Sequence, residues 1–427
     1  MKVAIIGSGI SGLTAAYYLA PHAEVTLYEK ASRLGGHTAT VDVELDGRTY
    51  AIDTGFIVYN EKTYPNFMRL LEELGVAVKK TVMGFSVSSS IDGLEYSGAG
   101  LAALFAQKRN LFSLKHWRMI LDILRFNREA AKDLQAGRVH PNVTLGDYLS
   151  RHRYSESFIH HYLVPMGAAI WSASTQMMLA FPMQFFIRFF HNHGLLQIRN
   201  RPQWYVIEGG SRSYIAPMLS ASQAEVKLNA AIASVSQYEG QVVINLTDGG
   251  IEQYDEVIFA CHSDQALSLL SDPAEEECSV LEAMPYQMNE VILHTDESML
   301  PRLRRTWSSW NYLLNNYQQE QATLTYNMNI LQGIKAPVTF CVTLNNGKAI
   351  NPQKILATFQ YAHPVFTCES LLAQQRWQEI NGKRQRWYCG AYWRNGFHED
   401  GVVSALNVVN ALLKKMGKPQ IGVLDHE

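Results

Sequence analysis

One short stretch near the N-terminus constrains the fold more than any other part of the chain. Residues 2–6, KVAII, form an apolar, partly β-branched run that predicts a buried parallel strand. The motif GSGISG follows at residues 7–12, and an Ala- and Leu-rich stretch that predicts a helix extends to about Leu19. Residues 24–28 predict a second strand, and Glu29 stands at its end. This order of strand, glycine turn, helix, strand and acid is the fingerprint of a dinucleotide-binding βαβ unit.

Each glycine of the motif has a separate physical role. Gly7 permits the tight turn, Gly9 lets the backbone approach a pyrophosphate, and Gly12 lets the helix pack closely on the strand. The helix N-terminus presents unpaired N–H groups to the phosphates. Glu29 can accept hydrogen bonds from both ribose hydroxyls. The stretch therefore predicts a bound dinucleotide.

A second glycine-rich match, at residues 98–103, does not fit the same fingerprint. Asp122 follows it at a similar spacing, but this acid lies inside a predicted helix and not at the end of a strand. We interpret residues 98–103 as a helix start only. One fingerprint predicts one dinucleotide, without a second domain for a nicotinamide cofactor.

The composition describes a globular protein with a large core, since 47% of its 427 residues are hydrophobic and 18% are charged. A net charge of −2 gives no overall attraction to nucleic acid, so no nucleic-acid partner is expected. Five cysteines without a Cys-x-x-Cys pair favour a reducing compartment. With no signal peptide and no apolar run long enough to span a bilayer, the sequence predicts a cytoplasmic protein.

Two regions of the middle of the chain allow more than one interpretation. Residues 108–128 are amphipathic and basic, which fits either peripheral contact with the inner face of a membrane or a domain helix with its apolar face inward. Residues 166–196 are rich in Met, Phe and Ala, which fits either the lining of a long apolar substrate tunnel or ordinary core. His191 and His193 would lie on different faces of a helix, so no metal site is predicted.

The C-terminal half alternates strands with glycine turns. Residues 225–259 are rich in predicted strands, and the runs between 289 and 345 predict an antiparallel sheet. Residues 386–392 predict a strand, residues 395–401 a loop, and residues 402–415 a helix. A second helix N-terminus after a glycine loop predicts a second site for negative charge.

Several of these segments together resemble one superfamily. SRLGGHT at 32–38, DTGF at 53–56 and CGAYWRNGFHEDG at 389–401, together with the N-terminal fingerprint, resemble the flavin amine oxidase, protoporphyrinogen oxidase and phytoene desaturase superfamily. The chain looks most like its bacterial "predicted NAD/FAD-binding protein" branch, which is similar to the flavoprotein part of plant cyclopropane fatty acid synthases. The resemblance implies FAD as the cofactor. Non-covalent binding is expected because Cys389 lies toward the phosphate side, away from the position of the flavin-linked cysteine in some relatives.

The resemblance also implies an α/β fold, α+β overall. A Rossmann-type FAD-binding domain with a parallel sheet would be joined to a substrate domain of antiparallel sheet and helices. The FAD-binding domain would be discontinuous, with segments 1–95, 205–270 and 385–427. The substrate domain would have a helical part, 96–204, and a sheet part, 271–384. Residues 272–277 read as an exposed linker.

Site residues follow from the resemblance, position by position. The residues expected to bind FAD are Gly7, Gly9, Ile10, Ser11, Gly12, Glu29, Lys30, Arg33, Gly35, Gly36, His37, Thr38, Thr54, Gly55, Phe56, Ile232, Ala260, Gly390, Phe397, Asp400, Gly401 and Val402. The candidates for catalysis are His37, His294 and Phe397, and further polar candidates near a substrate are Asn60, Asn311 and His398. An aromatic pair over the flavin would combine Phe397 with Tyr392 or Trp393.

The leading interpretation is an FAD-dependent oxidoreductase that transfers a hydride from a fatty-acyl or other lipid chain to flavin N5. A primary amine or polyamine oxidase is the first alternative. However, amine oxidases carry a lysine on the strand after the chain returns to the nucleotide domain, and residues 288–294, MNEVILH, contain none. The second alternative is a non-catalytic FAD-binding partner of a lipid-modifying methyltransferase, because bacterial members of the branch are associated with such proteins.

Overall fold

A five-stranded parallel sheet forms one end of the protein. The computed structural model describes residues 1–140, 142–198 and 200–425. The strand order is β10-β2-β1-β14-β20, and every pairing is parallel. The strands are β1 (Lys2–Ile6), β2 (Glu24–Tyr28), β10 (Glu225–Lys227), β14 (Glu256–Phe259) and β20 (Arg386–Tyr388). The sheet, with the antiparallel pairing described below, confirms the expected fold class.

Two cores cover the two faces of this sheet because successive side chains of a strand point in opposite directions. Val3 and Ile5 face a core shared with α1 (Ile10–Leu19), α2 (Pro65–Glu73), α10 (Ile215–Ser222) and α16 (His398–Lys415). Ala4 and Ile6 face a core formed with α11 (Ser263–Leu269), α12 (Glu275–Glu282), α14 (Cys368–Gln375), α15 (Trp377–Ile380), and the antiparallel strands β11 (Ile232–Tyr238), β12 (Gln241–Leu246) and β13 (Ile251–Tyr254).

A seven-stranded sheet forms the second part, in the order β19-β15-β18-β17-β16-β7-β8. Its strands are β7 (Phe85–Ser89), β8 (Glu95–Ser97), β15 (Tyr286–His294), β16 (Trp310–Leu314), β17 (Leu324–Asn327), β18 (Cys341–Leu344) and β19 (Ile355–Pro364). All pairings are antiparallel except β16 with β7. β7 and β8 pair in this sheet, although β7 lies before, and β8 begins at, the expected end of the first cofactor-binding segment at residue 95.

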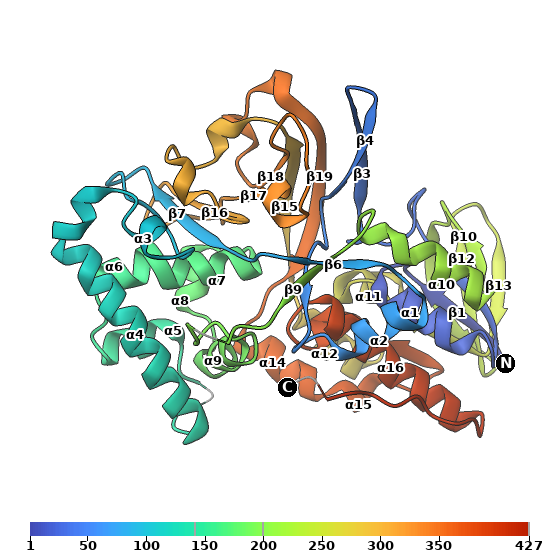
Figure 1. Cartoon of the computed structure of the whole chain (residues 1–427). Helices are drawn as coiled ribbons and strands as arrows, with labels where there is room; N and C mark the ends of the chain where they lie inside the picture. The colour runs from blue at the N-terminus through green and yellow to red at the C-terminus, as the bar shows by residue number, and fades with distance from the viewer. Residues whose placement is uncertain (141, 199, 426–427) are drawn as a thin grey trace.

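Helices cover the seven-stranded sheet and form the other end of the molecule (Figure 1). They are α3 (Leu101–Leu104), η1 (Lys108–Phe112), α4 (Leu114–Gln135), α5 (Leu145–Arg151), α6 (Glu156–Phe158), α7 (Val164–Trp171), α8 (Thr175–Leu179) and α9 (Met183–Asn192). Most large side chains of residues 166–196 are buried in one core with the sheet, as in the core interpretation of this stretch. No helix in the described part of the chain is long and apolar enough to cross a membrane.

The boundaries of two predicted helices differ in the structure. The amphipathic helix begins at Leu114 and not at residue 108, because the Ser113 hydroxyl caps it by accepting the N–H of His116. The C-terminal helix begins at His398 and not at residue 402, with Phe397 at its N-cap. The second glycine match leads only into the four-residue α3, after the antiparallel β8, as expected.

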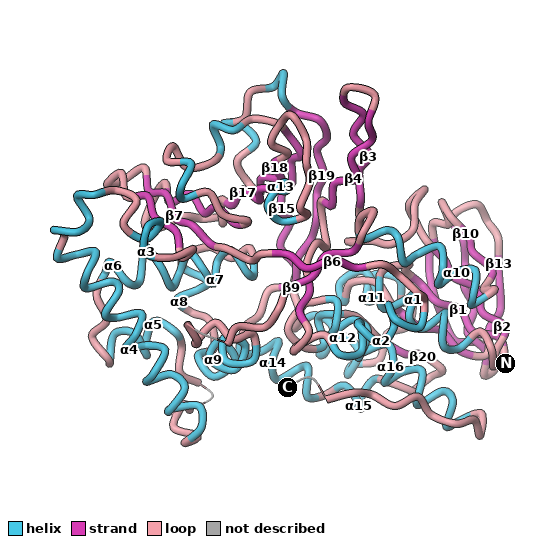
Figure 2. Tube along the Cα trace, in the orientation of Figure 1, coloured by secondary structure: helices cyan, strands magenta, loops and turns pink. Residues whose placement is uncertain are grey.

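Short strands join the two parts. The predicted hairpin is present as β3 (Thr40–Leu45) and β4 (Arg48–Asp53), with positive φ at both Asp46 and Gly47 of its turn. A small sheet of β5 (Tyr59–Asn60), β9 (Trp204–Ile207) and β6 (Val78–Thr81) carries the chain between them. Figure 2 shows β6 and β9 crossing the middle of the molecule.

The prediction of an exposed linker at residues 272–277 is correct for Pro273, Glu275 and Glu276, which are exposed, and wrong for the end of the segment, where α12 begins. Glu277 is buried on α12 and forms an ion pair with Arg386, which is fully buried on β20 (2.9 Å). Asp272 forms a second ion pair with the same guanidinium. The acidic run therefore contains the partners of a buried arginine, which a count of charges along the sequence cannot distinguish from a solvated segment.

Candidate flavin site

The glycine turn between β1 and α1 forms the base of the site. A Cβ added at Gly12 would lie 1.9 Å from the carbonyl oxygen of Gly7, and one at Gly7 would lie 2.8 Å from that of Ala260. Both glycines are therefore required by backbone packing. A Cβ at Gly9 would meet no heavy atom within 4 Å. Gly9 faces open space beside closely packed backbone, which fits the phosphates of a dinucleotide.

Two helix N-termini meet at this turn. A Cβ on Gly401, in the first turn of α16, would lie 2.8 Å from Ile10 and 2.9 Å from the hydroxyl of Ser11, at the start of α1. No side chain caps α1, so its first N–H groups remain available to a ligand. Both positive helix ends therefore converge on the same place, where negative charge is stabilised.

The acids in the first turn of α16 cap helices. Asp400 accepts the N–H of Phe397 (2.8 Å), and burial raises the pKa of Asp400 to about 7. Glu399 accepts the N–H groups of Asn66 (3.0 Å) and Phe67 (2.8 Å) at the start of α2, and burial raises its pKa as well. The carboxylate of Asp400, which we predict to contact FAD, is thus engaged with its own helix.

Glu29 closes the other side of the glycine turn. One of its carboxylate oxygens accepts both the N–H (3.1 Å) and the hydroxyl (2.5 Å) of Ser8, and the other accepts the N–H of Ala31 (2.8 Å). These bonds hold the acid at the end of β2, in the position that the fingerprint requires of a ribose ligand. Lys30 beside it is exposed.

The double-glycine loop lies against the first glycine turn. A Cβ at Gly36 would lie 3.3 Å from the Cα of Gly9. The N–H of Gly35 donates to the carbonyl of Ser8 (3.0 Å), and the guanidinium of Arg33 donates to the carbonyl of Gly36 (3.0 Å). Two segments that both resemble cofactor-binding motifs are therefore held together by backbone contacts.

Side chains from three distant segments meet behind this loop. The ring Nε2 of His398 lies 3.1 Å from the hydroxyl of Thr38 and 3.2 Å from that of Tyr214, and these two hydroxyls also bond to each other. The ring of Phe56 stacks on that of His398, with centroids 3.5 Å apart. Burial holds the pKa of His398 well below its usual range. The network joins the double-glycine loop, the DTGF segment and α16.

Three histidines, His37, His262 and His363, form what we call the histidine cluster. The ring centroid of His37 lies 6.0 Å from that of His262 and 5.5 Å from that of His363. Burial, followed by repulsion between the rings, lowers the pKa of His37 and of His262 to about 4, and that of His363 to about 3. Nε2 of His37 is buried without a hydrogen-bond partner among the described residues. The cluster is therefore uncharged at neutral pH and has a free ring nitrogen for a ligand.

His363 is positioned by neighbouring strands and by α7. Its Nδ1 lies 3.0 Å from the hydroxyl of Ser172 and 3.3 Å from the amide of Asn289 on β15. Tyr361, two residues earlier on β19, bonds to the hydroxyl of Thr54 (3.0 Å). Strands of the second sheet thus reach the cofactor-binding segments at this point.

The structure does not bring His294 to this site. His294 lies seven residues along β15 from Gln287, which pairs with His363, so about 23 Å separates the two positions. Both of its ring nitrogens are engaged, with the hydroxyl of Thr343 (2.7 Å) and the N–H of Asp296 (3.0 Å). His294 is a buried, hydrogen-bonded residue of the seven-stranded sheet.

Asn60 and Asn311 also make structural bonds. Asn60 bonds to Thr63 through both ends of its amide. Asn311 bonds to Ser86 (2.8 Å) and to the carbonyl of Thr325 (3.0 Å), inside the seven-stranded sheet. Their side chains hold turns and strands in place.

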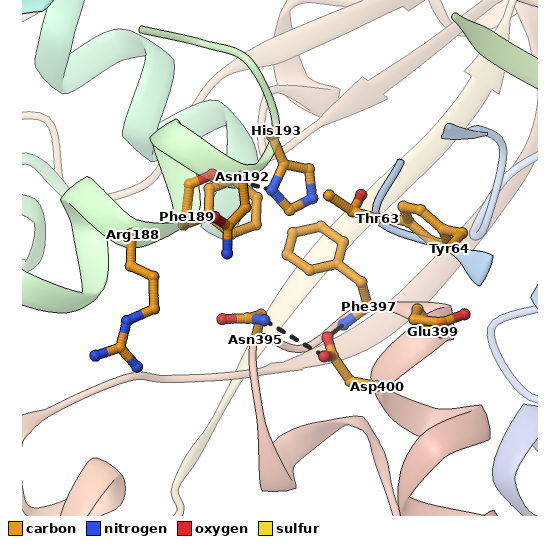
Figure 3. A pocket seen from close by; sticks show the side chains of 10 residues that line it. All are labelled: Thr63, Tyr64, Arg188, Phe189, Asn192, His193, Asn395, Phe397, Glu399 and Asp400. Carbon is orange, nitrogen blue, oxygen red and sulfur yellow. Dashed lines mark hydrogen bonds between the residues drawn. The ribbon is translucent and has the colours of Figure 1, made fainter. Parts of the chain in front are cut away.

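Phe397 borders a pocket between α9 and the first turn of α16 (Figure 3). Its ring stacks on that of Phe189 with centroids 5.2 Å apart, and the ring of His193 lies 6.0 Å away. The other lining residues are Thr63, Tyr64, Arg188, Asn192, Asn395, Glu399 and Asp400. Tyr392 and Trp393 instead pack in the core on the opposite face of the parallel sheet. The aromatic partner of Phe397 therefore comes from α9.

The remaining predicted positions lie around the same base. Ala260 lies against Gly7, and the N–H of Gly390 donates to the hydroxyl of Ser404 on α16 (3.1 Å). The N–H of Ala230 donates to the carbonyl of Glu29 (3.0 Å), which places the start of β11, with Ile232, near the end of β2. Val402, on α16, is buried in the core that α16 shares with α1. The Cys389 thiol is also buried, which raises its pKa and makes it a poor nucleophile.

Comparison with known proteins settles the family. The sequence profile described as "Flavin containing amine oxidoreductase" matches residues 10–326, which is more than half of the chain. The protein belongs to the flavin-containing amine oxidoreductases. It is therefore an FAD-dependent oxidoreductase, and the resemblance to this superfamily is confirmed. No curated protein sequence matches the chain significantly.

Several solved structures share the whole fold. A putative protoporphyrinogen oxidase from Exiguobacterium sp. 255-15 has a TM-score of 0.69 at 17% identity, covering 97% of this chain and 99% of that one. A CLA-producing fatty acid isomerase from P. acnes has a TM-score of 0.68 at 14% identity, covering 97% and 98%. A cyclohexylamine oxidase from Brevibacterium oxydans IH-35A has a TM-score of 0.67 at 15% identity, covering 98% of this chain and 99% of that one. At these identities the likeness establishes the fold alone.

Sequence reasoning missed four residues that the structure places here: Tyr214, His262, Tyr361 and His363. A signal existed for two of them, because residues 355–364, ILATFQYAHP, carry the β-branched and aromatic residues of a strand, and no strand was predicted there. His262 lies three residues after the end of β14, at the N-cap of α11 and at the carboxyl edge of the parallel sheet where ligands bind.

Proposed function

We propose that this oxidoreductase dehydrogenates an apolar, lipid-like substrate. The observation that supports this proposal is the combination of stacked aromatic rings, neutral histidines and acids that are already engaged as helix caps. Phe189 and Phe397 form one wall, and the histidine cluster is held neutral by burial. The carboxylates of Glu399 and Asp400 are engaged in helix capping. Such a lining suits a hydrocarbon chain and provides no dedicated partner for an ammonium group.

The chain's own residues would bind the cofactor, exclude water and accept a proton. FAD, when bound, supplies the acceptor for the hydride. The convergent N-termini of α1 and α16 stabilise negative charge at the glycine turn. Conversion of a CH2–CH2 unit to CH=CH releases one hydride and one proton. The free Nε2 of His37 belongs to a neutral imidazole, which is the state that can accept such a proton.

The strand β15 supports the lipid proposal over amine oxidation. It contains no lysine. Its residues that contact the histidine cluster are Tyr286, whose ring stacks on that of His262, and Asn289, which bonds to His363. The structural relatives include both a fatty acid isomerase and a cyclohexylamine oxidase.

Anaerobic reduction of the bound flavin tests this proposal. The FAD-loaded protein would be mixed with stearate, oleate and phospholipid in one series, and with putrescine, benzylamine and cyclohexylamine in another. We expect the acyl series to bleach the flavin absorption and to yield a product two hydrogens lighter by mass spectrometry. Phe397→Ala should raise the KM for the acyl substrate, and His294→Gln, at a remote buried histidine, should leave it unchanged.

The other outcomes of this experiment would support one of the two alternative functions. Bleaching by amines alone would make the protein an amine oxidase and reject the lipid substrate. Bleaching by neither series would reject turnover of both classes and favour an FAD-binding partner of a lipid-modifying methyltransferase.

A further inference from the structure

Exposed apolar side chains form a strip from α3 through η1 to the first half of α4. Phe112, Leu114 and Leu101 are 89%, 86% and 76% exposed, which makes them the three most exposed large hydrophobic residues in the described part of the chain. We define the apolar strip as these three residues with Leu111, Trp117, Leu121 and Leu124. Contiguous exposed apolar surface of this kind marks an interaction site.

Helix α4 has two apolar faces, and only one of them is covered by the protein. Its buried residues are His116, Met119, Asp122, Phe126 and Ala130. The exposed residues Leu114, Trp117, Leu121 and Leu124 follow one another at intervals of three, four and three, so they share another face of the helix. Figure 1 shows α4 at the outer edge of the molecule, at the end away from the parallel sheet.

Hydrogen bonds hold the strip in a fixed shape. The indole N–H of Trp117 donates to the carbonyl of Leu111 (2.9 Å), which fastens η1 to α4. The ring Nε2 of His116 lies 3.1 Å from the carbonyl of Leu104, which fastens the end of α3. Arg109 donates to the carbonyl of Gly93 (2.7 Å). The apolar side chains are therefore displayed by an ordered surface.

Positive charge is concentrated in the same segment. Between residues 98 and 128 the basic residues are Lys108, Arg109, Lys115, Arg118, Arg125 and Arg128, and the only acid is Asp122. Asp122 is buried and paired with Arg125 (3.3 Å) and Arg118 (3.6 Å). Six positive charges and one negative give +5 in a chain whose total is −2, so the remaining residues sum to −7. Arg302, before η5 (Arg304–Thr306), and Arg305, within it, are also exposed, and η5 packs on α3.

We propose that the apolar strip docks this protein on an anionic lipid surface. Trp, Phe and Leu beside Lys and Arg on one face is the composition of an interfacial helix. The charge asymmetry orients the basic end toward an anionic surface and the acidic remainder away from it. A second copy of the chain would instead place two positive strips against each other, which like charges oppose. This inference does not depend on the substrate of the flavin site.

Co-sedimentation with vesicles tests the docking surface in the full, FAD-loaded chain. We expect binding to vesicles of phosphatidylcholine with phosphatidylglycerol, and weak binding to phosphatidylcholine alone. The double variant Phe112→Ser, Leu114→Ser removes the two most exposed apolar side chains and should weaken binding at least tenfold. Lys108→Glu with Lys115→Glu should also weaken binding at least about tenfold, because each basic side chain near an anionic surface contributes several-fold.

A matched control distinguishes binding through this surface from nonspecific hydrophobic adsorption. Ile251→Ser with Leu372→Ser removes two hydrophobic side chains that are 67% and 63% exposed elsewhere, and it should leave vesicle binding unchanged. All variants should keep the flavin content and melting temperature of the wild type, because the altered side chains are exposed. Absence of wild-type binding to anionic vesicles, or an equal loss in the control variant, overturns the proposal. Self-association through the strip without vesicle binding also overturns it.

Discussion

Alanine substitutions at two glycines of the first turn should separate folding from cofactor binding. In Gly12→Ala the new Cβ would lie 1.9 Å from the carbonyl oxygen of Gly7, and this neighbour is backbone that cannot rotate away. Helix α1 must therefore move off the sheet, which we expect to cost about 3 kcal/mol or more of unfolding free energy. In Gly9→Ala the Cβ meets no protein atom, and φ of −64° is allowed for alanine. Its stability should stay within about 0.5 kcal/mol of wild type.

The flavin affinity of Gly9→Ala should fall although its stability does not. The methyl group of Gly9→Ala occupies the space where the phosphates approach, so FAD binding should fall strongly in a protein that remains folded. Urea unfolding of the flavin-free protein measures stability, and quenching of FAD fluorescence on titration measures affinity. Gly98→Ala, in the second glycine match, places its Cβ only in ordinary contact with the carbonyl oxygen of Phe85 (4.0 Å) and should change neither quantity. Wild-type stability in Gly12→Ala, or wild-type FAD affinity in Gly9→Ala, would refute the roles assigned to these glycines.

Three further predictions follow from the buried charged and titratable groups. Arg386→Ala leaves the buried carboxylate of Glu277 without its guanidinium partner and should lower the unfolding free energy in urea by about 3–5 kcal/mol. Arg384→Ala, at the partly exposed neighbour, should cost less than about 1 kcal/mol. The histidine cluster stays neutral in the folded state but can be protonated when unfolded, so its contribution to stability should rise from about pH 4 to 6.5, with a smaller slope in His363→Asn. Asp400 has a raised folded pKa of about 7, so its contribution changes in the opposite direction, and Asp400→Asn should make the rise steeper. Urea midpoints measured across this pH range test both predictions. If His37 accepts the proton, His37→Gln should retain FAD while slowing anaerobic flavin reduction by about a hundredfold or more in stopped-flow absorbance, and an unchanged rate would exclude that role.

The glycine turn at the base of the site could be predicted from the sequence because its conformation depends on a few consecutive residues. The roles of Gly7, Gly9 and Gly12 follow from a turn of six residues, and the structure places each glycine in the corresponding environment. The hairpin turn at Asp46 and Gly47 was equally predictable, since it depends on two consecutive residues with positive φ.

The opposite side of the site depends on contacts between distant segments. His262 follows β14 of the parallel sheet, and His363 lies on β19, which pairs with β15 in the other sheet. Both become neighbours of His37 only when the two sheets come together, which no pattern along the chain specifies. His294 was misjudged for the converse reason. Its type and its strand suited a catalytic role, but the length of β15 carries it to the far end of the sheet.

The order of strands in the parallel sheet has a consequence for the synthesis of the protein. The first strand ends at Ile6, and the edge strand β20 begins at Arg386, about 380 residues later. The first turn of α16, which packs on the start of α1, follows only after that strand. A chain still emerging from the ribosome therefore holds the glycine turn without its second helix end. Stable capture of flavin must wait until α16 has been synthesised, and the N-terminal segment must stay able to pack against it during that time.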